Sequence, residues 1–167
     1  MKKYLRGLLG AVLLASSVAL VLLPGWLPLD VEREVNLSFL EDEPKSKVFL
    51  YFGYPECGES CPRILSLLAK ENRSDLAVWL VNLNPEAQDG VAAVWAKSAH
   101  AEFNGFQPDR KQLSALAREF GLKFNRNTLA HNSKGYWINR RGDDWVLENV
   151  TPKPWLEDES RLAALLQ

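Results

Sequence analysis

The chain of 167 residues contains only two cysteines and two histidines. The cysteines, Cys57 and Cys61, can form a single pair, which excludes a wider disulfide framework. Any thiol or thiolate chemistry of the protein must therefore be located at these two residues. The N-terminal segment has no cysteine that could carry a lipid.

The sequence also lacks an excess of basic residues. It has 20 Lys and Arg residues against 21 Asp and Glu residues, and Lys2, Lys3 and Arg6 lie at the N-terminus. The rest of the chain then has a net charge of about −4, so nothing in it calls for a nucleic-acid partner. Internal repeats and low-complexity tracts are missing too, and the size of the chain after residue 29 suits one domain with a single core.

Charged side chains are missing from residues 7–29. As a helix, the apolar core of this segment, residues 7–23, would span roughly 25 Å at about 1.5 Å per residue, slightly short of the thickness of a bilayer core unless residues 25–29 contribute. A cleaved signal peptide and a retained anchor both fit, but the apolar sequence that follows Ala19 favours an anchor over residues 1–29. Because the basic residues stay on the cytoplasmic side, we expect the remaining chain to be translocated.

The segment YFGYPECGESCP, residues 51–62, places the two cysteines four residues apart where an apolar strand turns into a helix. Pro62 fits the first helical position, which puts Cys61 near the N-cap and Cys57 in the preceding turn. The helix dipole there favours thiolate over thiol. Two adjacent thiolates suit Cu(I), zinc or a reversible disulfide, and a purely structural disulfide is the remaining interpretation.

Beyond the anchor, hydrophobic periodicity predicts alternating strands and helices. We expect strands at 47–54 and 76–83, helices at 63–72, 90–103 and 111–120, a turn at 104–109, a hairpin formed by 135–139 and 144–150, and a final helix at 155–166. This order predicts an α/β, thioredoxin-like fold, with a central mixed sheet flanked by helices. The predicted domain is residues 47–167, and residues 30–46 form a linker with a short strand at 35–39.

The cysteine segment resembles the signature of the Sco/SenC copper chaperones, in which C-x-x-x-C-P follows a strand. Later segments agree in order, namely VNLNPEAQD at 81–89 and the histidine-bearing LAHNSKGYWINRRGD at 129–143. The resemblance covers residues 47–150 and implies a thioredoxin-like fold with copper bound by Cys57, Cys61 and His131. Gly58 and Glu59 stand where the family usually has proline and aspartate, which marks a divergent member.

The resemblance further implies a membrane-tethered copper chaperone that assists cytochrome c oxidase assembly. It would deliver copper to a respiratory oxidase copper site, or prepare the thiols of that site. The implied partners are the copper-site subunit and a thiol reductase or copper donor. The implied location is the bacterial inner membrane, with one span and a periplasmic domain. Such a protein is a metallochaperone rather than an enzyme. An imidazole from His131 would let the thiolate site hold Cu(II) as well as Cu(I), whereas His100 is expected to be a surface or core residue.

A thiol-disulfide oxidoreductase that uses Cys57 and Cys61 as its redox pair is the alternative. Thioredoxin-type enzymes carry C-x-x-C and a cis-proline before the hairpin strand, but no proline lies between Pro108 and Pro152. A peroxidase would place its cysteine among threonine and arginine, and no such cluster is present. A membrane-tethered interaction domain with only a stabilising disulfide is the third hypothesis.

Overall fold

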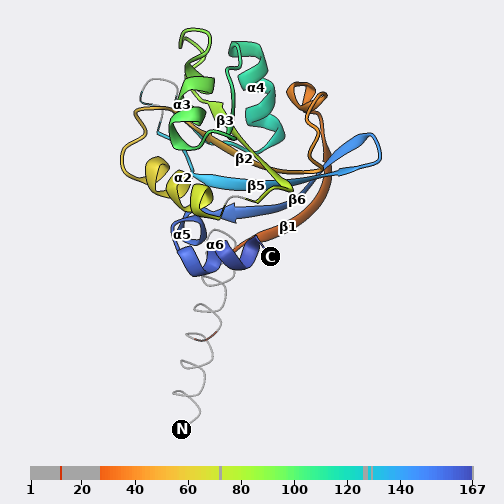
Figure 1. Cartoon of the computed structure of the whole chain (residues 1–167). Helices are drawn as coiled ribbons and strands as arrows, with labels where there is room; N and C mark the ends of the chain where they lie inside the picture. Colours follow the sequence, from red (N-terminus) through yellow and green to blue (C-terminus); the bar gives the residue numbers. More distant parts are fainter. Residues whose placement is uncertain (1–11, 13–26, 72, 126–127, 129, 167) are drawn as a thin grey trace, which may run out of the picture.

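The computed structural model describes residue 12 and residues 27–71, 73–125, 128 and 130–166 (Figure 1). The predicted anchor, residues 1–29, therefore lies almost wholly outside the described residues. Within the described part of the chain, no helix combines the length and the hydrophobicity that a membrane span requires.

A mixed six-stranded sheet forms the centre of the described chain. Its strands are β1 (Leu29–Val35), β2 (Lys47–Gly53), β3 (Leu76–Asn82), β4 (Asn104–Phe106), β5 (Lys134–Arg141) and β6 (Asp144–Pro152), in the spatial order β1-β6-β5-β2-β3-β4. β2, β3 and β4 pair in parallel, and the other neighbours are antiparallel. The predicted α/β class with a central mixed sheet is confirmed.

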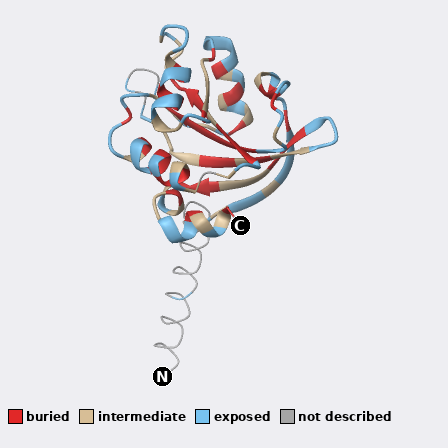
Figure 2. Cartoon of the chain, in the orientation of Figure 1, coloured by how far each residue is buried: buried red, intermediate tan, exposed pale blue. Residues whose placement is uncertain are grey.

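Helices cover both faces of this sheet and enclose two hydrophobic clusters (Figures 1 and 2). One cluster lies under α2 (Ser60–Lys70), α3 (Val91–Ala99), α5 (Lys153–Leu156) and α6 (Glu159–Leu165). The other lies under α4 (Arg110–Glu119) and a short 3-10 helix, η2 (Ser38–Leu40). We call the side of the sheet that carries the first cluster the α2 face, and the side that carries the second cluster the α4 face.

β2 is central because almost every side chain along it is apolar or aromatic. All its residues after Lys47 are buried, with Phe49 and Tyr51 on the α2 face and Leu50 and Phe52 on the α4 face. A strand with both faces covered reads as such a continuous apolar run. β5 pairs with it antiparallel, with Tyr51 opposite Gly135. The C-terminal end of β2 and the N-terminal end of β5 consequently lie side by side, at the end of the sheet where the parallel strands finish.

Helix ends differ by a few residues from the sequence-based expectations, with α3 ending at Ala99 rather than at 103, and three further elements differ more. The N-terminal strand is Leu29–Val35 rather than 35–39, and it pairs with β6 as the edge of the sheet, where its exposed charged side chains reach solvent. The expected turn at 104–109 contains β4, a three-residue strand beside β3. The expected last helix is divided into α5 and α6, because Asp158 caps α6 by accepting a hydrogen bond from the Arg161 amide.

Candidate metal centre

The two cysteines lie on the turn that joins β2 to α2. The turn closes when the Cys57 amide donates to the Tyr54 carbonyl, 3.1 Å away, and it continues through Gly58 at φ +44°. A glycine adopts this left-handed conformation without steric cost. α2 begins at Ser60, earlier than expected, so Cys61 lies inside its first turn and Pro62 is third in the helix. The proline is tolerated there because the first amides of a helix have no intrahelical acceptor.

Cys57 and Cys61 form a disulfide in this structure. Cys61 is 1% exposed and Cys57 is 9% exposed, so Cys57 is the more accessible sulfur. The absence of a side chain at Gly53 makes room for the pair. A Cβ built at Gly53 would lie 3.2 Å from the Cys61 Sγ and 3.0 Å from the Trp95 ring. The last residue of β2 therefore determines how closely the helix can approach the strand end.

The loop after β3 lies beside the Cys57 turn at the same end of the sheet. The Leu83 amide, just after β3, donates to the Gly53 carbonyl at 2.7 Å. The side chain of Asn82, fully buried, accepts from the Asn84 amide and donates to Gln107. Gln107 in turn donates to the Asn84 carbonyl. These bonds fix the backbone beside the cysteines, and Asn84 contributes through its main chain.

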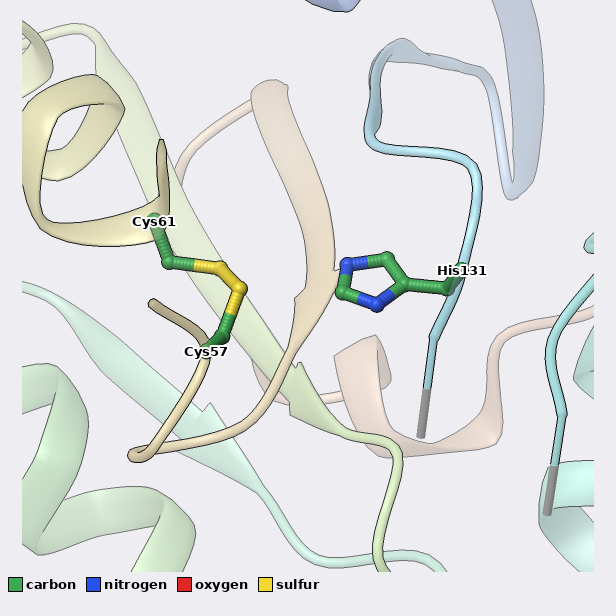
Figure 3. Close-up of side chains that lie close together, drawn as sticks. All are labelled: Cys57, Cys61 and His131. Atoms are coloured by element: carbon green, nitrogen blue, oxygen red, sulfur yellow. A yellow bond between two sulfur atoms is a disulfide. The ribbon is translucent and has the colours of Figure 1, made fainter. Parts of the chain in front are cut away.

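His131 comes from the segment between α4 and β5 and faces the disulfide (Figure 3). It forms an isolated antiparallel bridge with Phe124, and its ring contacts the Tyr54 ring edge-to-face at 5.9 Å between centroids. One ligand atom of His131 and the two sulfurs all lie within 4.8 Å of one another. The structure thus brings together the three residues that the sequence singled out.

Two further residues belong to this site that sequence reasoning did not place there. Tyr51, a buried residue of β2, has its hydroxyl 3.6 Å from the Cys61 Sγ. Burial raises the pKa of Tyr51 to about 12, while a hydrogen bond from Ser133 acts in the opposite direction. The Ser133 Oγ also lies 3.5 Å from the His131 Nε2. Ser133 follows His131 by two residues, but only the pairing of β5 with β2 shows that it reaches Tyr51.

The donor set defines the chemistry that is open to this site. Two thiolates and an imidazole are ligands for Cu(I), Cu(II) and zinc, and the same two sulfurs can cycle between dithiol and disulfide. A disulfide offers no thiolate, so metal binding requires the reduced pair. The carboxylates of Glu56 and Glu59 are exposed on the turn, where they add negative potential. The group fits copper once it is reduced.

The fold and the site define a class, a thioredoxin-like protein with a Cys-Cys-His group at the end of its central strands. Neither a protein-family model nor a curated protein matches the sequence. Solved structures do match it. Apo Sco1 from Thermus thermophilus is 23% identical with a TM-score of 0.56, and the match covers 84% of this chain and 91% of that one.

Bradyrhizobium japonicum ScoI with copper bound is 17% identical at a TM-score of 0.54, over 75% of this chain and 87% of that one. The peroxidoxin BcpB from Mycobacterium tuberculosis is 16% identical at a TM-score of 0.53, over 85% and 94%. The chain therefore has the thioredoxin-like fold that Sco proteins share with a peroxidoxin. The resemblance to Sco/SenC copper chaperones is confirmed at the level of the fold.

Proposed function

We propose that this chain is a divergent Sco/SenC protein that binds one copper ion through reduced Cys57, reduced Cys61 and His131. The observation that carries the proposal is the convergence of these three side chains within 4.8 Å. They come from two separate segments about seventy residues apart, and the sheet register brings those segments to one edge. The predicted thioredoxin-like domain over residues 47–167 is the unit that would carry this site.

Copper fits this donor set better than a structural zinc ion does. Structural zinc sites take four protein ligands, whereas the group found in the described part of the chain has three. Thiolate sulfur favours Cu(I), and imidazole extends the site to Cu(II). Two neighbours by fold, the Bradyrhizobium and Arabidopsis ScoI proteins, have copper bound in their structures.

Reduction must come before copper capture. A dithiol reductant supplies two electrons and two protons, the Cys57–Cys61 bond breaks, and the reductant leaves as its own disulfide. Binding of copper then releases the protons of the two thiols, since the thiolate is the ligand. His131 is already directed at the sulfurs in the oxidised state (Figure 3). It can complete the site without a rearrangement of the fold.

We further propose that copper is cargo. The site is built from two loops at one edge of the sheet, and Cys57 remains partly accessible at 9%. Thiolates of a client could replace Cys57, His131 and Cys61 one at a time. The proposed client is the copper-site subunit of a respiratory oxidase, with residues 1–29 tethering the domain to the outer side of the bacterial inner membrane. A copper donor or thiol reductase would reload the site.

A second function is favoured by one observation, which is the disulfide itself. A translocated thioredoxin-like domain with a reversible pair at a helix start could exchange disulfides with other proteins. The fold is also that of the peroxidoxin BcpB. This alternative needs both cysteines and has no use for His131 as a ligand. His131 therefore distinguishes the two functions.

The test is a copper titration of the reduced full-length chain, wild type against His131→Ala. We expect one Cu(II) per chain, with a sulfur-to-copper charge-transfer band that the variant loses. Its Cu(II) affinity should fall by more than about 100-fold, because even residues that only support a ligand are worth 10–100-fold. His100→Ala is the matched control, since His100 lies by Phe103 and its Nδ1 accepts from the Glu102 amide.

Equal copper affinity and an equal spectrum in His131→Ala and His100→Ala would contradict the proposed ligand set. If the reduced wild type bound no copper while its disulfide equilibrated readily with dithiols, the oxidoreductase would be the better assignment. Zinc binding that is tighter than Cu(I) binding, measured by competition between the two metals for the reduced chain, would reject the choice of metal.

A further inference from the structure

A phenol hydroxyl lies against the less accessible sulfur of the pair. Tyr51 is fully buried on the α2 face of β2, and its Oη is 3.6 Å from the Cys61 Sγ. A disulfide sulfur carries no hydrogen, so in the oxidised structure the phenol is the donor. The contact directs an O–H dipole at the atom that becomes negatively charged when the pair is reduced.

Ser133 lies between the phenol and the histidine. Its hydroxyl lowers the pKa of the Tyr51 phenol against the effect of burial, and its Oγ lies 3.5 Å from the His131 Nε2. A hydroxyl has one hydrogen and accepts through its lone pairs, so Ser133 and Tyr51 can each accept from one neighbour and donate to the other. The series runs from the His131 Nε2 to Ser133, then to Tyr51, and ends at the Cys61 Sγ. These contacts connect the His131 segment with the cysteine turn.

The register of the sheet explains why these side chains meet. Tyr51 is opposite Gly135 in the antiparallel β2–β5 pair. Ser133 lies two residues before Gly135, hence on the same face and just past the strand end. Gly135 has no side chain, and a Cβ there would come within 2.4 Å of the Phe49 ring. The close approach of β5 to the Phe49 ring thus requires a glycine at this position.

We propose that Tyr51 is a positioning residue whose hydrogen bond to the Cys61 sulfur stabilises the reduced pair, and that Ser133 orients both Tyr51 and His131. A hydrogen bond to a charged partner is roughly twice as strong as one to a neutral partner. Tyr51 thus favours the thiolate over the disulfide. It also lowers the energy of the sulfur electrons that a bound Cu(II) would draw upon. The second consequence rests on the proposed function, whereas the first does not.

The first experiment measures the thiol-disulfide equilibrium of the full-length chain against dithiothreitol, without metal. Each exchange moves two electrons from dithiothreitol into the Cys57–Cys61 bond, giving two cysteine thiols and the cyclic disulfide of the reagent. Tyr51→Phe should shift this equilibrium about tenfold toward the protein disulfide, equal to about 30 mV for a two-electron couple. The matched control is Tyr136→Phe, which also removes a buried phenol hydroxyl, one that donates to the Phe120 carbonyl on the α4 face.

A second readout is the charge-transfer band of the Cu(II)-loaded protein. Loss of the hydrogen bond raises the energy of the sulfur electrons, so Tyr51→Phe should move the band to longer wavelength. Ser133→Ala should shift the equilibrium and the band in the same directions by a smaller amount, since Tyr51 keeps its place but loses its orienting partner. Tyr136→Phe should leave both unchanged. A purely structural role for Tyr51 predicts a loss of stability with no directed shift in either quantity.

An unchanged disulfide equilibrium in Tyr51→Phe overturns this inference, whatever the protein does with copper. An equal shift in Tyr136→Phe overturns it too, because the effect would then come from general loosening. Should Tyr51→Phe fail to fold, Ser133→Ala decides, and an unshifted equilibrium in that variant rejects the inference. A wild type that binds no copper, with the equilibrium shifted as expected, rejects only the proposed function.

Discussion

The two faces of the sheet bury one tyrosine each, and they use it differently. On the α4 face, Tyr136 packs edge-to-face against Phe52 and Phe120, with centroids 5.5 and 5.0 Å apart, and its hydroxyl donates to a main-chain carbonyl. On the α2 face, Tyr51 is buried just as deeply, but its hydroxyl meets the Cys61 sulfur. Burial raises the pKa of both phenols.

The two faces of the sheet therefore have different roles: the α4 face contributes stability, and the α2 face also carries the reactive side chains. The α4 face is an aromatic and aliphatic core in which the polar tip of Tyr136 is satisfied by the backbone. The α2 face adds a disulfide, a histidine and two linked hydroxyls at its edge. Substitutions on the first face should therefore alter folding alone, and changes on the second should alter the site.

The largest effect is expected for Phe52→Ala on the α4 face. Phe52 is 2% exposed and contacts the Phe120 and Tyr136 rings. Truncation of a buried phenylalanine costs about 3–5 kcal/mol of unfolding free energy. We expect this loss in urea denaturation of the full-length chain, with an unchanged copper affinity for the protein that remains folded. A parallel loss of copper affinity would show that the two faces are coupled.

A smaller change is expected when the disulfide on the α2 face is reduced. Closing so short a loop contributes about 2 kcal/mol or less in the chain-entropy model. Reduced protein should therefore unfold at lower urea than oxidised protein. Copper at about 1,000 times its dissociation constant should then stabilise the reduced protein by about 4 kcal/mol, which is more than the reduction removed. If copper fails to stabilise the reduced chain, the α2 face does not bind it.

The smallest of these changes is expected for Gly53→Ala, next to Phe52 in sequence but directed at the α2 face. The new methyl group would lie 3.2 Å from the Cys61 Sγ and 3.3 Å from the Tyr51 ring. Mild overpacking of this kind costs about 1 kcal/mol, at the low end of the usual range. The displaced sulfur should nevertheless weaken copper binding, so that this variant and Phe52→Ala show opposite patterns. Unaltered copper binding in Gly53→Ala would weaken the distinction.

Much of the architecture could be predicted because the central strands are continuous apolar runs. β2 and β3 were expected to within one residue, and the hairpin formed by β5 and β6 was found with its turn at Gly142. The Cys-Cys-His group could be predicted because these residue types are rare in the chain. A resemblance in sequence motifs then joined His131 to the cysteines.

The remaining features depend on tertiary pairing. β1 is an exposed strand rich in charged residues, which periodicity does not distinguish from a linker, and β4 is three residues that read as a turn. The link from Tyr51 through Ser133 to His131 arises from the register of β2 against β5, which no local pattern encodes. Only the capping of α6 by Asp158 had a local signal, an aspartate directly before a helical segment.

The central claim is that Cys57, Cys61 and His131 together bind copper. The most direct measurement is X-ray absorption at the copper edge on the reduced, Cu(I)-loaded full-length chain, which counts sulfur and nitrogen neighbours of the metal. The account predicts two sulfur ligands and one nitrogen ligand, with the nitrogen absent in His131→Ala and present in His100→Ala. A copper ion with sulfur ligands alone in the wild type, or with a nitrogen ligand that survives His131→Ala, would contradict it.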